Sequence, residues 1–230
     1  MYNTPQKLVA EFVGTFTLIF AGVAAICSNQ LVGGGSGLVG VALAHGLAIA
    51  LMVAATCHIS GAHFNPAVTA ALWVTKRMGT IEAAGYWIAQ LAGATTAAYL
   101  LTLIFPSEVW RHVSLGTPAL APDVTPTLGM LIEAVLTFLL VFVIFGVAAD
   151  KNSGFNNLAP FAIGLTLTLD ILACGVLTGA AMNPARAFGP ALAAHAWANH
   201  AVYWVGPLAG GIAAGFLYDT LLMKKTAQSR

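Results

Sequence analysis

The chain carries very little charge. Charged residues make up 7% of its 230 residues, against about 25% in a typical soluble domain, while 59% are hydrophobic. The net charge is +1, which indicates no nucleic-acid partner. The three cysteines, Cys27, Cys57 and Cys174, are spaced neither as a disulfide framework nor as a metal site. We expect them to be buried small apolar side chains, and we expect no cofactor and no metal ion.

Polar segments are also scarce, because long apolar runs occupy most of the chain. A run of about 20 apolar residues is long enough to cross a bilayer. Six such runs are present, at about 7–27, 37–57, 81–105, 127–149, 158–178 and 199–222. The first contains Glu11 and lacks a small-residue cleavage pattern, so we interpret it as a mature helix and not a signal peptide. The sequence therefore predicts an all-α integral membrane protein, a single domain over residues 1–230 with six transmembrane helices in a lipid bilayer.

The basic residues favour one side of the membrane. Seven lie at the termini or in the second–third and fourth–fifth connections, which share one side: Lys7, Lys76, Arg77, Lys151, Lys224, Lys225 and Arg230. Only Arg111 and Arg186 lie on the other side. The positive-inside rule then predicts that both termini are cytoplasmic and that residues 106–126 form an extracellular loop.

The two halves of the chain repeat one another in sequence. Asn-Pro-Ala occurs at residues 65–67 and again, 118 residues later, at 183–185. Glu11 in the first span likewise matches Glu133 in the fourth, at an offset of 122. The second and fifth spans match at an offset of 118 (residues 44–48 and 162–166), and the third and sixth match at 117 (residues 87–93 and 204–210). Similar offsets through three spans and a loop indicate two homologous repeats.

Each repeat contains three spans. Repeat one covers about 7–105, repeat two covers about 127–222, and residues 106–126 join them. Because three is an odd number, the second repeat enters the membrane upside down. Inverted repeats place their shared functional site near the bilayer midplane, between the halves.

The loops that hold the tripeptides are too apolar for solvent and too short to cross the membrane. Proline is favoured at the first position of a helix, and asparagine is favoured just before it. We therefore expect two re-entrant half-helices, beginning at Pro66 and Pro184. Non-helical backbone at membrane depth is tolerated only where it is packed in protein or lines a cavity. Two half-helices meeting at midplane thus predict a pore.

Four polar side chains have expected roles in this arrangement. Glu11 and Glu133 are costly inside a span, and we expect each to accept backbone N–H hydrogen bonds from the re-entrant loop of its own half. Asn65 and Asn183 cap the half-helices, which leaves their amide N–H groups free to bind a water through its oxygen. The positive helix ends then oppose cations and interrupt the relay of protons.

The paired tripeptides Asn65-Pro66-Ala67 and Asn183-Pro184-Ala185, with Arg186 directly after the second, resemble those of the aquaporin (major intrinsic protein) family. The resemblance extends from Glu11 to about Asp219. It implies a homotetramer in which each subunit has its own pore. It also places Arg186 in the outer constriction, the aromatic/arginine filter, where a permanently charged guanidinium is a barrier to cations.

The same resemblance implies the other three filter residues. They are His45 in the second span, Ile171 twelve residues before Asn183, and Ala180 three residues before it. The usual water-strict set is Phe, His, a small residue and Arg. The present set is similar to that of plant tonoplast intrinsic proteins and of ammonia- and peroxide-permeable aquaporins, which implies a wider, amphipathic opening. Ala180 stands where mercury-sensitive members carry Cys, so we expect mercury resistance at the filter.

Several functions remain in competition. The leading hypothesis is a passive channel that conducts water in single file and excludes protons and ions, with ammonia, hydrogen peroxide and urea as further candidate solutes. A glycerol or small-polyol facilitator is disfavoured by Ala187 and by the pair Tyr203-Trp204, where glycerol channels typically differ. A structural membrane-junction protein is disfavoured by the intact motifs. An enzyme lacks a recognisable nucleophile, base or metal set, and a coupled transporter would need ionisable groups at midplane.

Other polar residues and the location are less defined. Asp170 is next to Ile171, and we expect it to point away from the pore, towards another helix or subunit. His63 is expected either to line the cytoplasmic vestibule or to pack within its loop. The loop 106–126 is expected to fold over the outer mouth, with His112 or Asp123 near the filter. Compact termini and a short fourth–fifth connection favour the cell membrane of a prokaryote.

Overall fold

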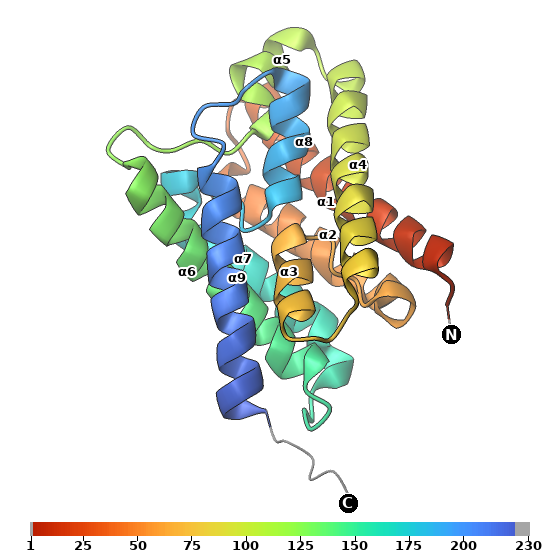
Figure 1. Cartoon of the computed structure of the whole chain (residues 1–230). Coiled ribbons are helices and arrows are strands. Elements are labelled where there is room, and N and C mark those ends of the chain that lie inside the picture. The colour runs from red at the N-terminus through yellow and green to blue at the C-terminus, as the bar shows by residue number, and fades with distance from the viewer. Residues whose placement is uncertain (1, 224–230) are drawn as a thin grey trace, which may run out of the picture.

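Six long helices form the body of the protein. The structure, a computed structural model, describes residues 2–223, and the predicted cytoplasmic charges Lys224, Lys225 and Arg230 lie outside that range. Each of the six is long and apolar enough to cross a membrane. They are α1 (Thr4–Leu31), α2 (Gly37–Ser60), α4 (Thr80–Ile104), α6 (Pro126–Ile144), α7 (Ala159–Thr178) and α9 (Val202–Leu217) (Figure 1).

Short turns of other helix types extend three of these helices. The π-helical turns η2 (Phe145–Ala149) and η4 (Tyr218–Leu222) continue α6 and α9, and the 3₁₀ turn η3 (Asn156–Leu158) precedes α7. The predicted spans agree with the helices to within a few residues. The largest differences, of three or four residues, are that α1 is longer at both ends, that α2 ends at Ser60 and not at 57, and that the last helix begins at Val202 and not at 199, because turns occupy residues 198–201.

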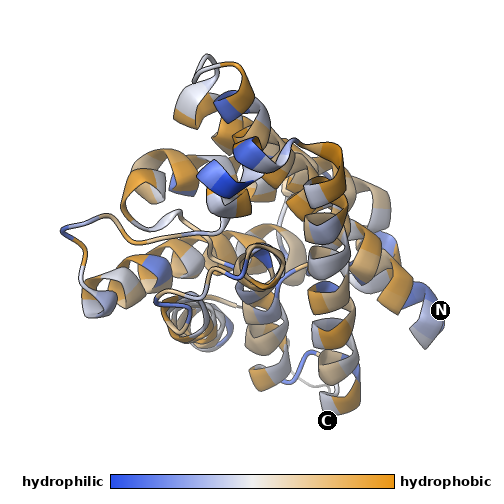
Figure 2. Ribbon diagram, turned by 90° about the horizontal axis from the view of Figure 1, so that it is seen from above, coloured by the Kyte–Doolittle hydropathy of each residue, from blue (hydrophilic) through white to orange (hydrophobic). Residues whose placement is uncertain are grey.

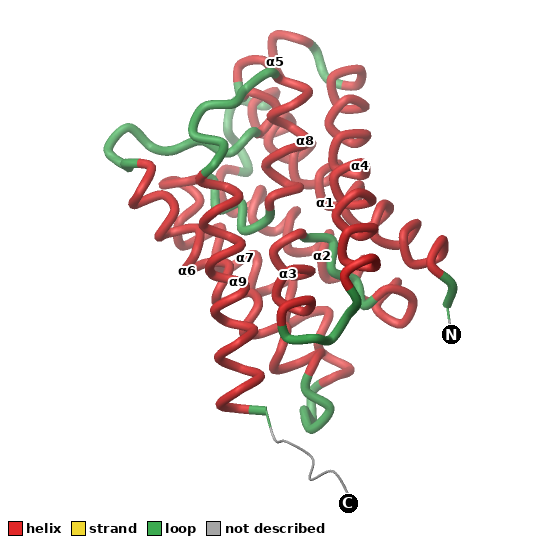
Figure 3. The backbone as a smooth tube through the Cα atoms, viewed as in Figure 1, coloured by secondary structure: helices red, strands yellow, loops and turns green. Residues whose placement is uncertain are grey.

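Two shorter helices, α3 (Pro66–Val74) and α8 (Pro184–Ala194), lie inside the bundle. Figure 1 shows α8 in the upper half of the molecule and α3 in the lower half, each between α4 and α9. The loops that lead into them run through the middle of the molecule (Figure 3). These are the predicted half-helices, and each begins at the proline of its tripeptide.

The helices pack in the same way in both halves. In the first half α1 packs against α4, as α6 packs against α9 in the second, and α2 and α7 join the halves. Each half-helix lies against the third long helix of the other half: α3 against α9, and α8 against α4. This exchange interlocks the two halves around one axis.

Glycine allows the closest of these contacts. A Cβ on Gly93 of α4 would overlap the carbonyl oxygen of Phe12 in α1, and one on Gly210 of α9 would overlap that of Ala134 in α6. Gly93 and Gly210 are 117 residues apart and so occupy matching places. The backbones in both halves therefore approach too closely for any side chain at these two positions.

The outer face of the bundle is apolar. Figure 2, an end-on view, shows hydrophobic residues distributed around the outside of the helices. Many large apolar side chains are exposed there, among them Leu51, Ile81, Ile88, Leu103, Leu131 and Leu169. Residues 2–223 contain helices, turns and loops but no strand, which confirms the predicted all-α membrane fold with six spans and two half-helices.

The connection between the halves covers one end of the bundle. It contains a short helix, α5 (Ser107–His112), and a 3₁₀ turn, η1 (Ser114–Gly116). The turn contacts α8 and α1, so the connection reaches the second half-helix. This contact places backbone groups of the connection next to the predicted filter.

Candidate functional site

The loops before the half-helices have a strained backbone, with several residues in the left-handed conformation. Each begins with a left-handed glycine that ends the preceding helix, Gly61 after α2 and Gly179 after α7. Two non-glycine residues in each loop are also left-handed, with φ between 42° and 55°: Ala62, Phe64, Ala180 and Met182. Such residues cost about 1–3 kcal/mol each and persist only where surrounding contacts hold them.

Glu11 supplies those contacts in the first half. Its carboxylate is fully buried and accepts hydrogen bonds from the backbone N–H of His63 (2.9 Å) and of Phe64 (2.7 Å). It also accepts from Ser60 Oγ (2.7 Å) and from Gln90 Nε2 (2.8 Å). Four donors around one carboxylate offset its desolvation and fix the loop.

Glu133 does the same in the second half. It accepts from the backbone N–H of Ala181 (2.9 Å) and of Met182 (2.7 Å), and from Thr178 Oγ1 (2.7 Å). These donors lie 118 residues after His63, Phe64 and Ser60. The second carboxylate has no counterpart of Gln90 among its hydrogen bonds.

A tyrosine completes each anchor. Tyr86 donates its hydroxyl hydrogen to the carbonyl of Ser60 (2.7 Å), and Tyr203 donates to that of Thr178 (2.9 Å). Both rings are almost completely buried. Tyr203, singled out in the sequence as a marker of solute class, therefore holds the end of α7 in place.

The two asparagines cap their half-helices. Asn65 Oδ1 accepts from the backbone N–H of Ala67 (2.8 Å), and Asn183 Oδ1 accepts from those of Ala185 (3.0 Å) and Arg186 (3.2 Å). Proline at the first helical position of each leaves one fewer unpaired donor. The side-chain oxygens are thus committed to the helix ends.

The side-chain nitrogens are less free than the sequence suggested. Asn65 Nδ2 donates to the carbonyl of Met182 (2.8 Å), and Asn183 Nδ2 donates to that of Phe64 (2.9 Å). An amide nitrogen has two hydrogens. One hydrogen of each asparagine therefore ties its half to the other half, and one is left for the cavity.

A cavity of about 610 Å³ runs along the interface of the halves. Both asparagines line it together with His45, Ile171, Ala180 and Arg186, so the structure brings the predicted filter and the asparagine pair to one passage. The rest of the lining is mostly apolar and includes Ile49, Val53, Val68, Leu140, Ile163 and Leu167. The lining does not include the prolines and alanines of the tripeptides, Pro66, Ala67, Pro184 and Ala185, which are buried in the first turns of the half-helices.

At the filter, His45 and Arg186 are fixed by backbone groups. His45 Nδ1 lies 2.8 Å from the carbonyl of Val41, so this nitrogen carries the hydrogen. The ring packs on Gly22 of α1, where a Cβ would overlap it. In the neutral ring Nε2 is then a bare acceptor, and it has no hydrogen-bond partner in the part of the chain that the structure describes.

Arg186 takes its partner from the connection between the halves. Its Nη1 donates to the carbonyl of Gly116 (2.9 Å), a residue with a φ of 63°. The connection was expected near the filter, but through His112 or Asp123, and both of these are exposed. Every residue has a backbone carbonyl, so the sequence does not show which one will act as the acceptor. The only local signal is Gly116 itself, because its left-handed φ favours glycine.

The end of the cavity opposite the predicted filter is lined by both polar and apolar residues. We call it the inner mouth and define it by Cys57, His58, Ala148, Ala149 and Asn157, all of which line the cavity. Cys57 is exposed and Cys174 is half-buried, so of the three cysteines expected to be buried only Cys27 is fully so. Cys57 lies on the side of α2 that lines the passage and not on a side that packs against another helix.

Two of the less defined polar residues also have definite places. His63 lines the cavity and packs edge-on against Tyr86, with ring centroids 5.0 Å apart. Asp170 is 1% exposed and is absent from the cavity lining, so it faces other helices of the same subunit. Among residues 2–223, no group of three potential metal ligands is close enough to hold an ion.

The fold and the site define a membrane channel built from two inverted halves. A model of the Major intrinsic protein family matches residues 2–218. The chain is 45% identical to Aquaporin TIP4-4 of Zea mays over 95% of this chain and 87% of that protein. It is 43% identical to Aquaporin NIP1-1 of Oryza sativa subsp. japonica over 94% of this chain and 74% of that protein.

The chain therefore belongs to the major intrinsic protein family. The family consists of channels, and the similarity to named aquaporins makes this chain a water channel and not an enzyme. A solved structure, that of the aquaglyceroporin from Plasmodium falciparum, superimposes with a TM-score of 0.83 over 95% of this chain and 97% of that one. At 24% identity this likeness is one of fold alone.

Proposed function

We propose that the cavity conducts water in single file and that Asn65, Asn183 and Arg186 exclude protons and other ions. The observation that carries the proposal is the reciprocal pairing of the two asparagines where both half-helix N-termini meet. A water that accepts from the remaining amide hydrogens must turn its own hydrogens towards its neighbours on both sides. That orientation interrupts a proton relay, and the helix ends, each carrying about half an elementary charge, repel cations.

The filter supports a broader solute range than water alone. Arg186 is a donor, whereas Ile171 and Ala180 are apolar and the Nε2 of His45 is buried against Gly22. An opening with one strong donor and mostly apolar walls suits compact neutral molecules that can accept a hydrogen bond. We therefore include ammonia, hydrogen peroxide and urea as solutes, with glycerol as the alternative that flux measurements must exclude.

Stopped-flow light scattering on proteoliposomes tests both parts. We expect fast water flux with a low activation energy, together with ammonia entry that falls in a His45→Phe variant while water flux persists. Glycerol entry above that of empty liposomes would favour the polyol facilitator. Water flux no faster than that of empty liposomes would contradict the channel and favour a structural role.

We further propose an orientation and a membrane for the channel. Lys7, Lys76, Arg77 and Lys151 support cytoplasmic termini, with the two repeats joined on the other side by residues 106–126. The compact termini and the short fourth–fifth connection support insertion in the cell membrane. A thiol-reactive, membrane-impermeant label on single-cysteine variants tests this. Labelling of His112→Cys but not of Lys151→Cys in intact cells is expected, and the reverse pattern or an intracellular location would contradict it.

A homotetramer with one pore per subunit is also proposed. Apolar exposed faces on the long helices can be covered by lipid or by other subunits. Native mass spectrometry from mild detergent should give four copies, and a monomer that remains active in liposomes would contradict the assembly.

A further inference from the structure

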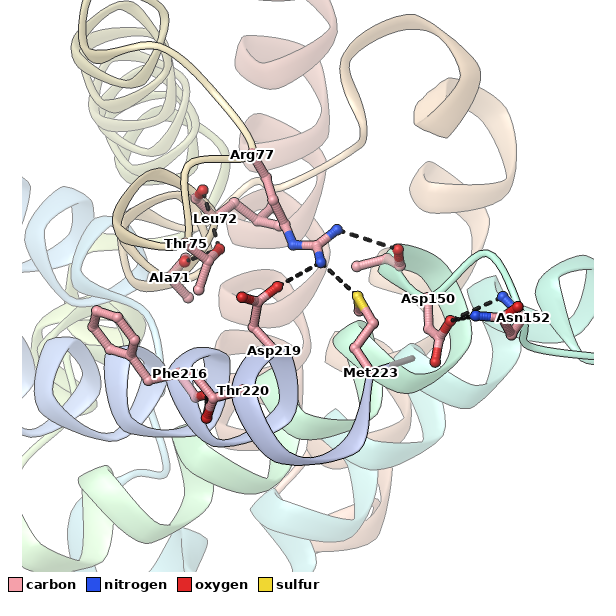
Figure 4. A network of polar contacts seen from close by, with 11 residues as sticks. Ala71, Leu72, Thr75, Arg77, Asp150, Asn152, Phe216, Asp219, Thr220 and Met223 are labelled. Atoms are coloured by element: carbon pink, nitrogen blue, oxygen red, sulfur yellow. Dashed lines mark hydrogen bonds and ion pairs between the residues drawn. The ribbon is translucent and has the colours of Figure 1, made fainter. Parts of the chain in front are cut away.

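Arg77 follows the first half-helix and connects it to the ends of two long helices. Its backbone N–H donates to the carbonyl of Leu72 (2.8 Å), which ends α3. Its guanidinium pairs with Asp219 in η4 through Nη2 and Oδ1 (2.7 Å). Figure 4 shows the side chain reaching between the two segments, with Met223 Sδ beside the same nitrogen.

The other arm of the guanidinium reaches η2. Nη1 lies 3.4 Å from the carbonyl of Ala149, the last residue of that π-helical turn, and Cζ lies 5.5 Å from the centre of the Phe145 ring at its start. The two π-helical turns also touch directly, since the Tyr218 ring lies 6.2 Å from that of Phe145. Arg77 therefore holds both ends of η2 and the start of η4 together.

The same turn is a wall of the pore. Ala148 and Ala149 of η2 line the inner mouth, and Val147 and Leu72, whose carbonyl Arg77 engages, line the same cavity. π-Helical turns are rare, have poorer geometry than α-helix, and occur often at functional sites. Without an external partner, η2 would be free to relax towards α-helical hydrogen bonding, which rotates its wall residues.

We propose that Arg77, held by Asp219, is a positioning residue for permeation that fixes the η2 wall and keeps the inner mouth open. The sequence gives this residue only a place in the charge count, and the filter and asparagine pair do not involve it. The inference rests on the proposed conduction of water, which the wild-type flux tests separately.

The test compares water flux per channel in proteoliposomes for variants of the pair. Arg77→Ala and Asp219→Asn should each lower water flux about two- to fivefold. This is the shift in population that the loss of one partly exposed ion pair can cause. The charge swap Arg77→Asp with Asp219→Arg should leave the flux reduced, because an aspartate at position 77 can neither donate to the Ala149 carbonyl nor form a cation–π contact with Phe145. The ratio of ammonia to water flux should not change, because the filter is untouched.

The protein contains a matched control in its second described ion pair. Lys7 and Glu82 join α1 to α4 at the same 2.7 Å, with 32% of each side chain exposed against 27% and 34% for Arg77 and Asp219, and neither lines the cavity. Lys7→Ala should leave flux unchanged. Wild-type flux in Arg77→Ala, or an equal fall in Lys7→Ala, would overturn the proposal.

A second measurement distinguishes a specific change in the η2 wall from a general folding defect of the variant. Reactivity of an Ala148→Cys thiol, in a Cys57→Ser background, reports directly on the η2 wall. We expect its rate of modification to change with Arg77→Lys, a substitution that keeps the charge but loses the forked contact. An unchanged rate in well-folded Arg77→Lys and Asp219→Asn proteins would also overturn it.

Discussion

Asn65 and Asn183 each donate a side-chain hydrogen bond to the residue that precedes the other. The acceptors are the carbonyls of Met182 (2.8 Å) and Phe64 (2.9 Å). Since these residues lie in loops from opposite ends of the bundle, the two bonds join the halves at the centre of the pore. The asparagines therefore have a structural role as well as the proposed role in permeation.

Asn183→Asp separates these roles from helix capping. A carboxylate still caps α8 through its oxygens, but it cannot donate to Phe64 O and it places a negative charge in the passage. We expect a loss of stability of about 1–3 kcal/mol, as for a buried group left without its partner, and a measurable proton leak. Thermal unfolding in detergent and a pH-gradient assay in liposomes test it. Unchanged values in both assays would contradict the paired geometry.

Glu133→Gln should destabilise the second re-entrant loop. Three donors now share two carboxylate oxygens, but glutamine offers one oxygen, and its NH₂ group would face a donor. We expect unfolding to become easier by about 1–3 kcal/mol and the filter to lose solute discrimination.

Glu11→Gln is the matched comparison, because the first carboxylate has four donors and none of them lies in the second loop, which carries Ala180. It should lower the stability to a similar or greater extent while ammonia-to-water selectivity is retained. Equal selectivity changes in both variants would argue against a separate action of each acid.

The sequence predicted the scaffold because each part has a local cause. Apolar length specifies a span, and Asn followed by Pro specifies a helix start, so α3 and α8 were placed to within a few residues. The contacts that fix the filter have no local cause. Arg186 binds a carbonyl of Gly116, 70 residues away, and a carbonyl is the same in every residue.

Departures from the repeat were also beyond sequence reasoning. Trp87 Nε1 donates to the carbonyl of Pro66 (3.1 Å), whereas the matching Trp204 donates to His200 Nε2 (3.1 Å). Equivalent residues thus acquire different partners when one half has a histidine within reach. The π-helical ends of α6 and α9 likewise depend on the ring and ion-pair contacts between them, which hydropathy does not encode.

Gly22→Ala should narrow the filter without changing any pore-lining residue. A Cβ on Gly22 overlaps the His45 ring, so the imidazole must move, and Val41 O loses its donor or the helix shifts. Overpacking of about 1–3 kcal/mol should lower water flux by roughly an order of magnitude. Gly35→Ala is the control, since its nearest neighbour, Val32 Cγ2, is 3.9 Å away. Equal flux in both variants would show that the ring does not limit passage.

Mercury should act on the filter only after Ala180 is replaced by cysteine. Ala180 lines the cavity, and the native thiol that also lines it is Cys57 at the inner mouth. We expect Ala180→Cys in a Cys57→Ser background to lose most of its water flux with mercuric chloride and to recover it with a thiol reductant. The Cys57→Ser protein alone should be resistant. Strong inhibition that survives both Cys57→Ser and Cys174→Ser would contradict the placement of these residues.

His200 should make stability depend on pH at the outer end of α9. Its ring lies 4.8 Å from that of Trp197 and accepts from Trp204, and burial lowers its pKa from the usual 6.5. Below about pH 6.5, His200 therefore binds a proton more readily in the unfolded chain than in the folded chain. The stabilisation is fully present above about pH 6.5 and is lost as pH falls below it, through the lower pKa of the folded state.

Thermal unfolding of the purified protein between pH 8 and 5 tests this sign. His200→Gln should flatten the acid limb of the profile, whereas His112→Gln, at an exposed site, should leave it unchanged. The neutral ring matters because its unprotonated Nε2 is the acceptor for Trp204. If His200→Gln and wild type lose stability in parallel below pH 6.5, the protonation of another group causes the loss. The hydrogen bond from Trp204 to His200 is then not its origin.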